Sequence, residues 1–181
     1  MIDWIQQLDW QILEQINTLR SPVMTAIMRF VSMLGNSGTV WIIICLLMLI
    51  RKKTRLAGIT ALALMIVCAV TNDAILKPLI ARPRPFSANP EWIALSTERS
   101  FSFPSGHSSN AAVTAFTYAR FFRWKALPFI LLALLIAFSR LYLGVHYPSD
   151  VAAGIAEGIV FSLLSGVVSK WIEGINPKLF N

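Results

Sequence analysis

Charged residues are scarce in this chain. They make up 14% of its 181 residues, whereas a soluble domain normally carries about 25%. Hydrophobic residues account for 56%, and the mean hydropathy is +0.63. The deficit of charge and the long apolar runs indicate a membrane protein, and the length allows only one domain. The net charge of +7 does not indicate binding to nucleic acid, because no soluble domain remains to present a basic face.

Cysteine is nearly absent. Cys45 and Cys68 are the only two, both lie inside apolar runs, and they show no metal-ligand spacing. We interpret them as buried thiols, which say nothing about the redox compartment. The chain also has no internal repeat and no Gly-x-Ser-x-Gly motif. The first absence counts against many transporters, and the second counts against a serine hydrolase.

The apolar runs predict an all-α fold, an integral membrane bundle of about six helices. We expect one transmembrane domain over residues 22–181. Four of its apolar runs are expected to span the membrane. Residues 56–76, 126–145 and 148–171 are long enough to do so, and the shorter run 108–122 is expected to be shielded by the other helices. Before them, residues 30–50 are apolar enough to cross a bilayer, but the Gly-Asn-Ser-Gly stretch at 35–38 interrupts this run. The alternative is two short helices over residues 22–34 and 39–50.

Two segments carry special patterns. Residues 1–21 place apolar residues at helical spacing between acids and glutamines, which predicts an amphipathic helix in the membrane interface. The last span carries Gly154, Gly158 and Ser162 at intervals of four. Small residues at this spacing let helices approach closely, so we expect a packing face there.

Two short basic loops set the orientation. Residues 51–55 contain four basic side chains, residues 120–125 contain three, and neither loop contains an acid. Under the positive-inside rule both loops are cytoplasmic. If each run crosses once, residues 77–107 and 140–150 meet at the opposite end of the bundle. The sequence thus predicts a multi-pass protein of the cell membrane with its polar motifs on the extracytoplasmic side.

The polar residues at that end fall in three short segments. Charges are costly beside hydrocarbon and tend to mark function there. The candidates are three cations, two histidines, one carboxylate and a small polar pair: Lys77, Arg84, Arg140, His107, His146, Asp150, Ser105 and Gly106. The cations can surround a phosphoryl group and offset the charge on its oxygens. The small pair precedes a helix expected from residue 108, whose N-terminus favours a bound anion.

The histidines suit covalent phosphate chemistry. His146 and Asp150 are four residues apart, so the carboxylate can accept a hydrogen bond from one ring nitrogen and leave the other as a nucleophile. His107 would then protonate the leaving oxygen as a general acid. A histidine nucleophile implies a phosphohistidine intermediate that water hydrolyses. We expect no metal or other cofactor, because the carboxylates are too few for a two-metal site and the cations would repel a divalent ion.

The order and spacing of these residues resemble a known family pattern. The stretches Lys77-(six residues)-Arg84-Pro85, Pro104-Ser105-Gly106-His107 and Ser139-Arg140-(five residues)-His146-(three residues)-Asp150 are similar to the three signature motifs of the type 2 phosphatidic acid phosphatase superfamily. The resemblance implies a metal-independent membrane lipid phosphatase with a six-helix core. It implies His146 as nucleophile, Asp150 as its partner and His107 as acid. It assigns phosphate binding to Lys77, Arg84, Ser105, Gly106 and Arg140.

The resemblance also implies the substrate class, a lipid phosphate or diphosphate in the bilayer. Undecaprenyl diphosphate is the first choice, and phosphatidylglycerophosphate or phosphatidic acid is the nearest alternative, because the motifs read only the phosphate. The alternative of another class is an anion or lipid transporter, although charges gathered at one end of the bundle count against it. A vanadate-dependent haloperoxidase shares this type of anion site but is soluble. The sequence does not indicate an oligomeric state.

Three further residues stay open. Asp73 precedes Lys77 by one helical turn, so it either orients the lysine or lies solvated at the interface. Arg82 lies outside the signature and suits contact with headgroups better than a direct catalytic role. Glu157 lies well inside the last span, where an acid usually faces the interior of the bundle. We leave it out of the site.

Overall fold

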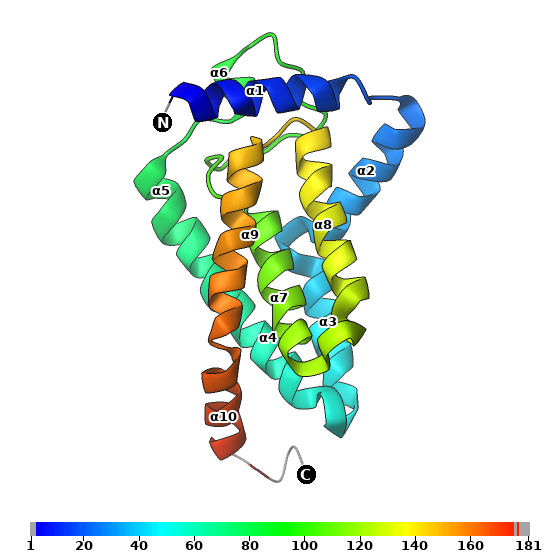
Figure 1. Cartoon of the computed structure of the whole chain (residues 1–181), viewed down its shortest axis with the longest axis vertical. Helices are drawn as coiled ribbons and strands as arrows, with labels where there is room; N and C mark the ends of the chain where they lie inside the picture. Colours follow the sequence, from blue (N-terminus) through cyan, green and yellow to red (C-terminus); the bar gives the residue numbers. More distant parts are fainter. Residues whose placement is uncertain (1–2, 176, 178–181) are drawn as a thin grey trace.

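The apolar runs form the helices of an all-α bundle in the computed structural model, which describes residues 3–175 and 177 (Figure 1). Residues 1–2 of the predicted amphipathic segment, and residues 176 and 178–181 of the predicted transmembrane domain, lie outside the described residues. The helices are α1 (Asp3–Asn17), α2 (Pro22–Gly35), α3 (Thr39–Ile50), α4 (Lys52–Val70), α5 (Lys77–Ile80), α6 (Pro85–Ala88), α7 (Gly106–Phe122), α8 (Leu127–Tyr142), α9 (Pro148–Leu163) and α10 (Ser165–Ile175).

Several helical stretches are long and apolar enough to cross a membrane. They are Pro22–Ile50, Lys52–Ala88 and Gly106–Tyr142, and α9 with α10 forms a further stretch bent by 44°. The stretch Gly106–Tyr142 reverses its direction at Arg123, where φ is +54° and ψ is −130°. It therefore supplies two helices that lie side by side, α7 and α8 (Figure 1). These findings confirm the all-α membrane bundle that the hydropathy predicts.

Helix α7 occupies the centre of the bundle. It packs against α4, α8 and α9 (Figure 1), and residues from Ala111 to Ala115 are buried on several of its sides. The closest approach is to α9. A Cβ atom added at Gly158 would come within 2.6 Å of the Cβ atom of Ala112, so only a residue without a side chain fits there. The shielding of this span and its small-residue packing partner agree with the prediction.

The first span is broken, as residues 35–38 led us to expect. A 3₁₀ turn, Asn36–Gly38, separates α2 from α3, with Ser37 at φ +51° and Gly38 at φ +70°. A second irregularity follows α4, where Thr71–Leu76 form a π-helical turn that leads into Lys77. Both distortions lie in long apolar helices, and π turns of this kind are frequently found at functional sites.

The two ends of the bundle differ in character. The α3–α4 and α7–α8 junctions, which carry the two basic loops, lie at the same end, together with α10 (Figure 1). The loops that carry the polar motifs lie at the opposite end, where α1 runs across the tops of the other helices (Figure 1). The chain thus brings residues 77–107 and 140–150 together, as the alternation of spans predicts.

Candidate active site

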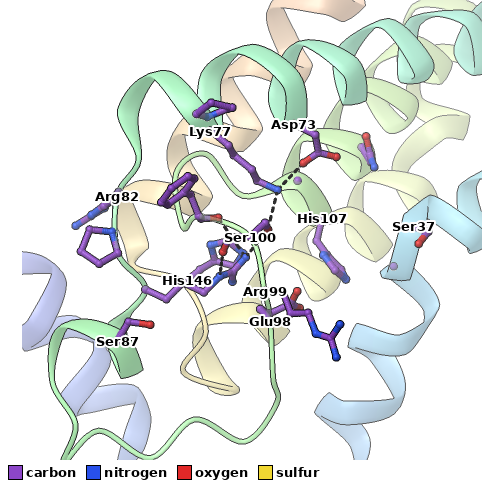
Figure 2. Close-up of a pocket in the computed structure, with 17 residues that line it drawn as sticks. Ser37, Asp73, Lys77, Arg82, Ser87, Glu98, Arg99, Ser100, His107 and His146 are labelled. Carbon is purple, nitrogen blue, oxygen red and sulfur yellow. Dashed lines mark hydrogen bonds and ion pairs between the residues drawn. The ribbon is translucent and has the colours of Figure 1, made fainter.

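A cavity of about 680 Å³ opens at this end of the bundle (Figure 2). Its size is in the range of ligand-binding pockets. Five of the predicted site residues line it: Lys77, Arg84, Gly106, His107 and His146. Asp73, Glu98, Arg99, Ser100, Phe101 and Asn110 also contribute to its walls. The residues come from the π-helical turn and α5, the loops on either side of α6, the first turns of α7 and the α8–α9 loop, which are far apart in the sequence.

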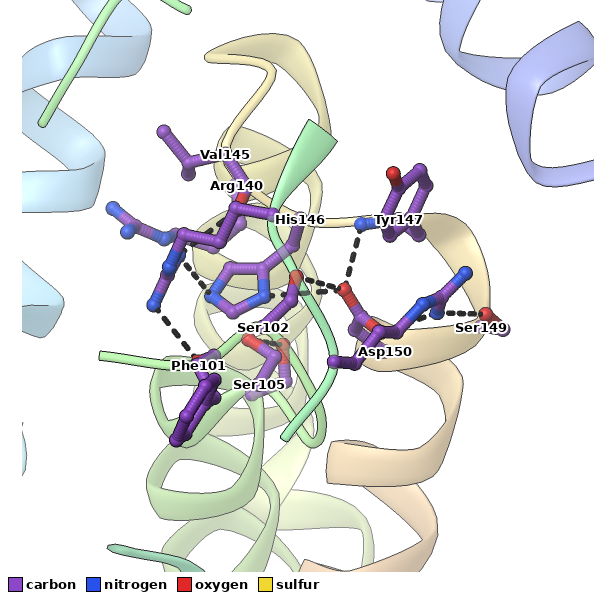
Figure 3. Close-up of polar contacts among 12 residues, drawn as sticks. Phe101, Ser102, Ser105, Arg140, Val145, His146, Tyr147, Ser149 and Asp150 are labelled. Atoms are coloured by element: carbon purple, nitrogen blue, oxygen red, sulfur yellow. Dashed lines mark hydrogen bonds and ion pairs between the residues drawn. The ribbon is translucent and has the colours of Figure 1, made fainter. Parts of the chain in front are cut away.

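His146 is 1% exposed and presents one ring nitrogen on each side (Figure 3). Its Nε2 lies 3.2 Å from Nη1 of Arg84, and its Nδ1 lies 3.5 Å from Oδ2 of Asp150. A guanidinium can only donate, so Nε2 must be the unprotonated nitrogen when it pairs with Arg84, and Nδ1 carries the proton that faces Asp150. This tautomer leaves the Nε2 lone pair directed toward the cationic side of the cavity.

The surroundings of His146 favour the neutral ring. Burial is the main reason that the pKa of His146 lies below its ordinary value, and Arg84 and Arg140 lower this pKa further. Contact with Asp150 acts in the opposite direction and raises the pKa. The imidazole is therefore unprotonated at neutral pH, which is the state a nucleophile requires.

Asp150 lies behind His146 and does not line the cavity. Its Oδ2 accepts hydrogen bonds from the backbone N–H of Tyr147 at 2.9 Å and from Oγ of Ser102 at 2.5 Å (Figure 3). Its Oδ1 accepts one from Nη1 of Arg82 at 2.5 Å. The carboxylate is thus held in one orientation toward His146, with the bond to Tyr147 arising because Asp150 occupies the third position of α9.

Arg84 is held by the loop before α7. Its Nε donates to the carbonyl of Ser100 at 2.6 Å, and its Nη1 donates to the carbonyl of Val145 at 2.9 Å. An arginine side chain has an ordinary pKa above 12 and is protonated at neutral pH. Carbonyl partners orient the guanidinium without neutralising it, so its charge remains directed at the cavity.

Lys77 is paired with Asp73. Its Nζ lies 2.6 Å from Oδ1 of Asp73 and 3.3 Å from Oγ of Ser100 (Figure 2). The ion pair considered from the sequence is therefore present, although the Asp73 side chain is 67% exposed. The amine remains at the cavity wall, where a phosphate oxygen could replace the carboxylate.

Arg140 and Ser105 lie close to the cavity but do not line it. Arg140 is 1% exposed and donates to Oγ of Ser32 and to Oε1 of Glu98, so the Glu98 carboxylate stands between Arg140 and the cavity. The hydroxyl of Ser105 accepts a hydrogen bond from Ser108 at 3.0 Å. Beside it, Gly106 does face the cavity, and a Cβ atom there would come within 3.6 Å of Nζ of Lys77.

His107 is placed by the break in the first span. Its Nε2 lies 3.0 Å from Oδ1 of Asn36. A Cβ atom added at Gly35 would come within 2.8 Å of Cδ2 of His107, so Gly35 leaves the space that the ring occupies. The sequence analysis identified the Gly-Asn-Ser-Gly interruption but attached no function to it.

The structure corrects the interpretation of Arg82 as a residue that contacts headgroups, and it adds a neighbour of the site, Asp9, that the sequence analysis missed. Arg82 is buried and donates both to Asp150 and to Oδ2 of Asp9, the latter at 2.7 Å. The signal for Asp9 is its position on α1, because it shares a face with Leu13 and Ile16, the other buried residues of that helix. An acid on the buried face of an amphipathic helix needs a partner inside the protein.

Glu157 belongs to a separate polar cluster below the cavity. Its Oε2 accepts hydrogen bonds from Nδ2 of Asn72 at 2.7 Å and from Oγ of Ser109 at 2.6 Å. The cluster joins the π-helical turn to α7 and α9. This arrangement agrees with leaving Glu157 outside the site and with an acid that faces the interior of the bundle.

Comparisons with known proteins point in one direction. Residues 52–173 match the family model described as the PAP2 superfamily. An undecaprenyl-diphosphatase from Sulfolobus acidocaldarius is 35% identical over 159 residues, which cover 86% of this chain and 75% of that protein. Phosphatidylglycerophosphatase B from Bacillus subtilis is 32% identical over 182 aligned positions, which cover 92% of this chain and 86% of that protein.

Solved structures show the same likeness. A crystal structure of a transmembrane PAP2-type phosphatidylglycerolphosphate phosphatase from Bacillus subtilis matches with a TM-score of 0.74 and 28% identity, over 93% of this chain and 87% of that one. The crystal structure of Aquifex aeolicus LpxE matches with a TM-score of 0.69 and 27% identity, over 88% of this chain and 95% of that one.

Proposed function

The chain belongs to the PAP2 superfamily, and from this premise we propose that it hydrolyses undecaprenyl diphosphate to undecaprenyl phosphate through a phosphohistidine intermediate, without a metal. It is a membrane protein and a lipid phosphatase of the PAP2 type. A phosphatase family match leaves no support for the transporter alternative. The observation that carries the proposed mechanism is the buried His146, whose Nε2 lies beside Arg84 while its Nδ1 faces the carboxylate of Asp150 at 3.5 Å.

In the first chemical step, Nε2 of His146 attacks the terminal phosphorus and the bond to the leaving oxygen breaks. His107 donates a proton to that oxygen, so the lipid phosphate leaves in a stable form. Asp150 stabilises the positive charge that develops on His146. Lys77 and Arg84 offset the charge on the equatorial oxygens, which is the role that a metal ion has in other phosphatases.

In the second step, water attacks the phosphorus of the phosphohistidine. His107, now unprotonated, accepts a proton from that water, and the bond between phosphorus and Nε2 breaks. Inorganic phosphate is released, and both histidines return to their starting protonation states. Ser105, Gly106 and Arg140 complete the phosphate-binding set in this proposal, with Arg140 becoming available once phosphate replaces the Glu98 carboxylate.

The proposed substrate is supported by relatives and by topology. Undecaprenyl-diphosphatases from Sulfolobus acidocaldarius and Bacillus subtilis are both similar to this chain. The two basic loops lie at the end of the bundle away from the cavity, which supports an extracytoplasmic site in the cell membrane. Phosphatidylglycerophosphate is the second candidate, because a phosphatidylglycerophosphatase B is also similar over most of its length.

The test is phosphate release by the detergent-purified protein in excess EDTA, beside a His146→Ala variant. The panel is undecaprenyl diphosphate, farnesyl diphosphate, phosphatidylglycerophosphate and phosphatidic acid, ranked by kcat/KM. We expect EDTA-resistant release that disappears in the variant and is fastest with undecaprenyl diphosphate. Release that requires a divalent ion, or that survives in His146→Ala, would contradict the mechanism. A faster reaction with phosphatidylglycerophosphate would replace the first substrate by the second.

Orientation is tested separately. A reporter fused to the C-terminus should report a cytoplasmic location, since α10 lies at the same end as the basic loops. An external reporter signal would reverse the orientation and remove the argument for a substrate headgroup in the outer leaflet.

A further inference from the structure

We propose that Asp9, on the helix that crosses the end of the bundle, is a positioning residue of the phosphatase site that acts through Arg82. Asp9 balances the charge of Arg82, so that Asp150 remains an effective negative partner of His146. This role rests on the proposed action of His146 as nucleophile. The amphipathic helix α1 is then part of the catalytic apparatus and more than a membrane anchor.

Arg82 bridges two buried carboxylates. It is 5% exposed, and its Nη1 donates to Oδ1 of Asp150 at 2.5 Å while its Nη2 donates to Oδ2 of Asp9 at 2.7 Å. Its guanidinium carbon lies 3.9 Å from the centre of the Tyr147 ring. A planar guanidinium that is stacked on one face and bonded at both ends has little freedom to move. The position of Asp150 is thereby coupled to the position of α1.

Asp9 is engaged as fully as Arg82. It is 2% exposed, and its Oδ1 accepts from the backbone N–H of Ser149 at 2.8 Å. Its Oδ2 accepts from Oγ of Ser149 at 2.5 Å as well as from Arg82. Ser149 precedes Asp150 in the first turn of α9, so Asp9 holds the start of that helix as well as the arginine. Burying a carboxylate is costly unless it is paired in this way.

The proposed role of Asp9 follows from the net charge of the group formed by Asp150, Arg82 and Asp9. Asp150 and Arg82 alone would form a neutral pair beside His146, whereas Asp9 adds the second negative charge and leaves the group of three with a net charge of minus one. His146 becomes positive when it is phosphorylated, and it needs that negative charge. Of the other charged or titratable side chains around His146, Arg84, Arg140, Lys77 and His107 carry no negative charge, and the cavity acids Glu98 and Asp73 are each paired with a cation, Arg140 and Lys77. The compensating charge therefore comes from α1 and α9.

The test compares Asp9→Asn with the wild type in kcat and in the pH dependence of kcat/KM. Asparagine keeps an oxygen that can accept from Arg82 but removes the charge. We expect kcat to fall on the order of tenfold, and the acidic limb of the profile to move to lower pH by up to about one pH unit. The sign follows because loss of a negative charge disfavours the protonated form of His146. A purely structural role for Asp9 would not move the profile.

Three companion variants complete the test. Glu14→Gln removes the same charge from an exposed position of the same helix and should leave kcat unchanged. Asp9→Glu keeps the charge and should retain more activity than Asp9→Asn. The double variant Asp9→Asn/Arg82→Gln restores the net charge of minus one and should recover part of the activity lost in Asp9→Asn.

The outcomes separate this inference from the proposed function. If His146→Ala is inactive and Asp9→Asn behaves like Glu14→Gln, only the inference about Asp9 is overturned. It is also overturned if the double variant recovers nothing, or if the loss in Asp9→Asn matches a loss of folded protein in size-exclusion chromatography. If His146→Ala keeps its activity, the proposed mechanism itself is wrong.

Discussion

The two histidines of the cavity have different direct partners. His146 is buried, touches the charged side chains of Arg84 and Asp150, and is backed by a further arginine and acid. His107 is only partly buried, and its ring nitrogen meets a neutral amide, that of Asn36. One ring is thus held by buried charges, and the other is held by one amide at a break in a helix.

This difference matches the two proposed tasks. A nucleophile must be unprotonated and must be stabilised when it becomes positive, and buried charges provide both conditions. A general acid must gain and lose a proton in each cycle, so a neutral partner beside an open cavity suits it better. The comparison predicts that variants on the His146 side lose more activity than matched variants on the His107 side.

The largest effect is expected for His146→Ala. Loss of a covalent nucleophile should lower kcat by at least about 10,000-fold, because the positioned cations alone cannot replace the attacking atom. Phosphate release from the purified variant measures this loss, and wild-type protein quenched in alkaline detergent, which preserves the acid-labile P–N bond, should carry labelled phosphate on His146. Labelled phosphate on any residue other than His146 would contradict the proposed difference between the two histidines.

His107→Ala should have the next largest effect. Removal of a general acid should lower kcat with a lipid substrate by about 100- to 10,000-fold. The loss should be much smaller with p-nitrophenyl phosphate, because that leaving group departs without a proton. Equal losses with both substrates would show that His107 binds the substrate and does not act as a general acid.

Asn36→Ala should lower kcat about tenfold, because one hydrogen bond that orients His107 is lost. The control is a double-mutant cycle. In a His107→Ala background the same change should have almost no effect, since there is no ring left to orient. Additive losses would show that Asn36 acts independently of His107.

A smaller effect of the surroundings of His146 is expected in the pH profile of the wild-type protein. Because the pKa of His146 is lowered and p-nitrophenolate departs without a proton from His107, kcat/KM for p-nitrophenyl phosphate should stay nearly constant as the pH falls from 7 through the ordinary histidine value of about 6.5, and should decrease only well below it. A midpoint at about 6.5 in this limb would mean that the nucleophile is far better solvated than the structure shows. Substrate phosphate ionisation is controlled by repeating the profile with a second aryl phosphate whose phosphate has a different pKa.

Asp73→Asn should have the smallest effect. The Asp73–Lys77 ion pair has one largely exposed partner, and such pairs contribute under about 1 kcal/mol. We expect kcat to change less than about threefold, and KM measurements will show whether the freed lysine binds phosphate more tightly. A loss as large as that of Asn36→Ala would place Asp73 among the positioning residues.

Much of the site could be predicted because its signals are local. Hydropathy located the spans, and the polar motifs at their ends had to meet at one side of the membrane. Asp73 and Lys77 are one helical turn apart, so their contact follows from helix geometry. The contact of His146 with Asp150 likewise needs only the turn that begins α9.

The remaining contacts depend on which helices pack together. Asp9 meets Arg82 across 73 positions of sequence, and Asn36 meets His107 across 71. Glu98 covers Arg140 because the loop before α7 folds over the end of α8. The sequence by itself determined a membrane-spanning helical bundle and three polar motifs, because hydrophobicity and short spacings are properties of neighbouring residues, and the likeness of those motifs to a phosphatase family implied the activity. Only the tertiary structure decided which distant acid or amide serves each histidine, because a buried charge takes as its partner whatever group the packing brings within reach.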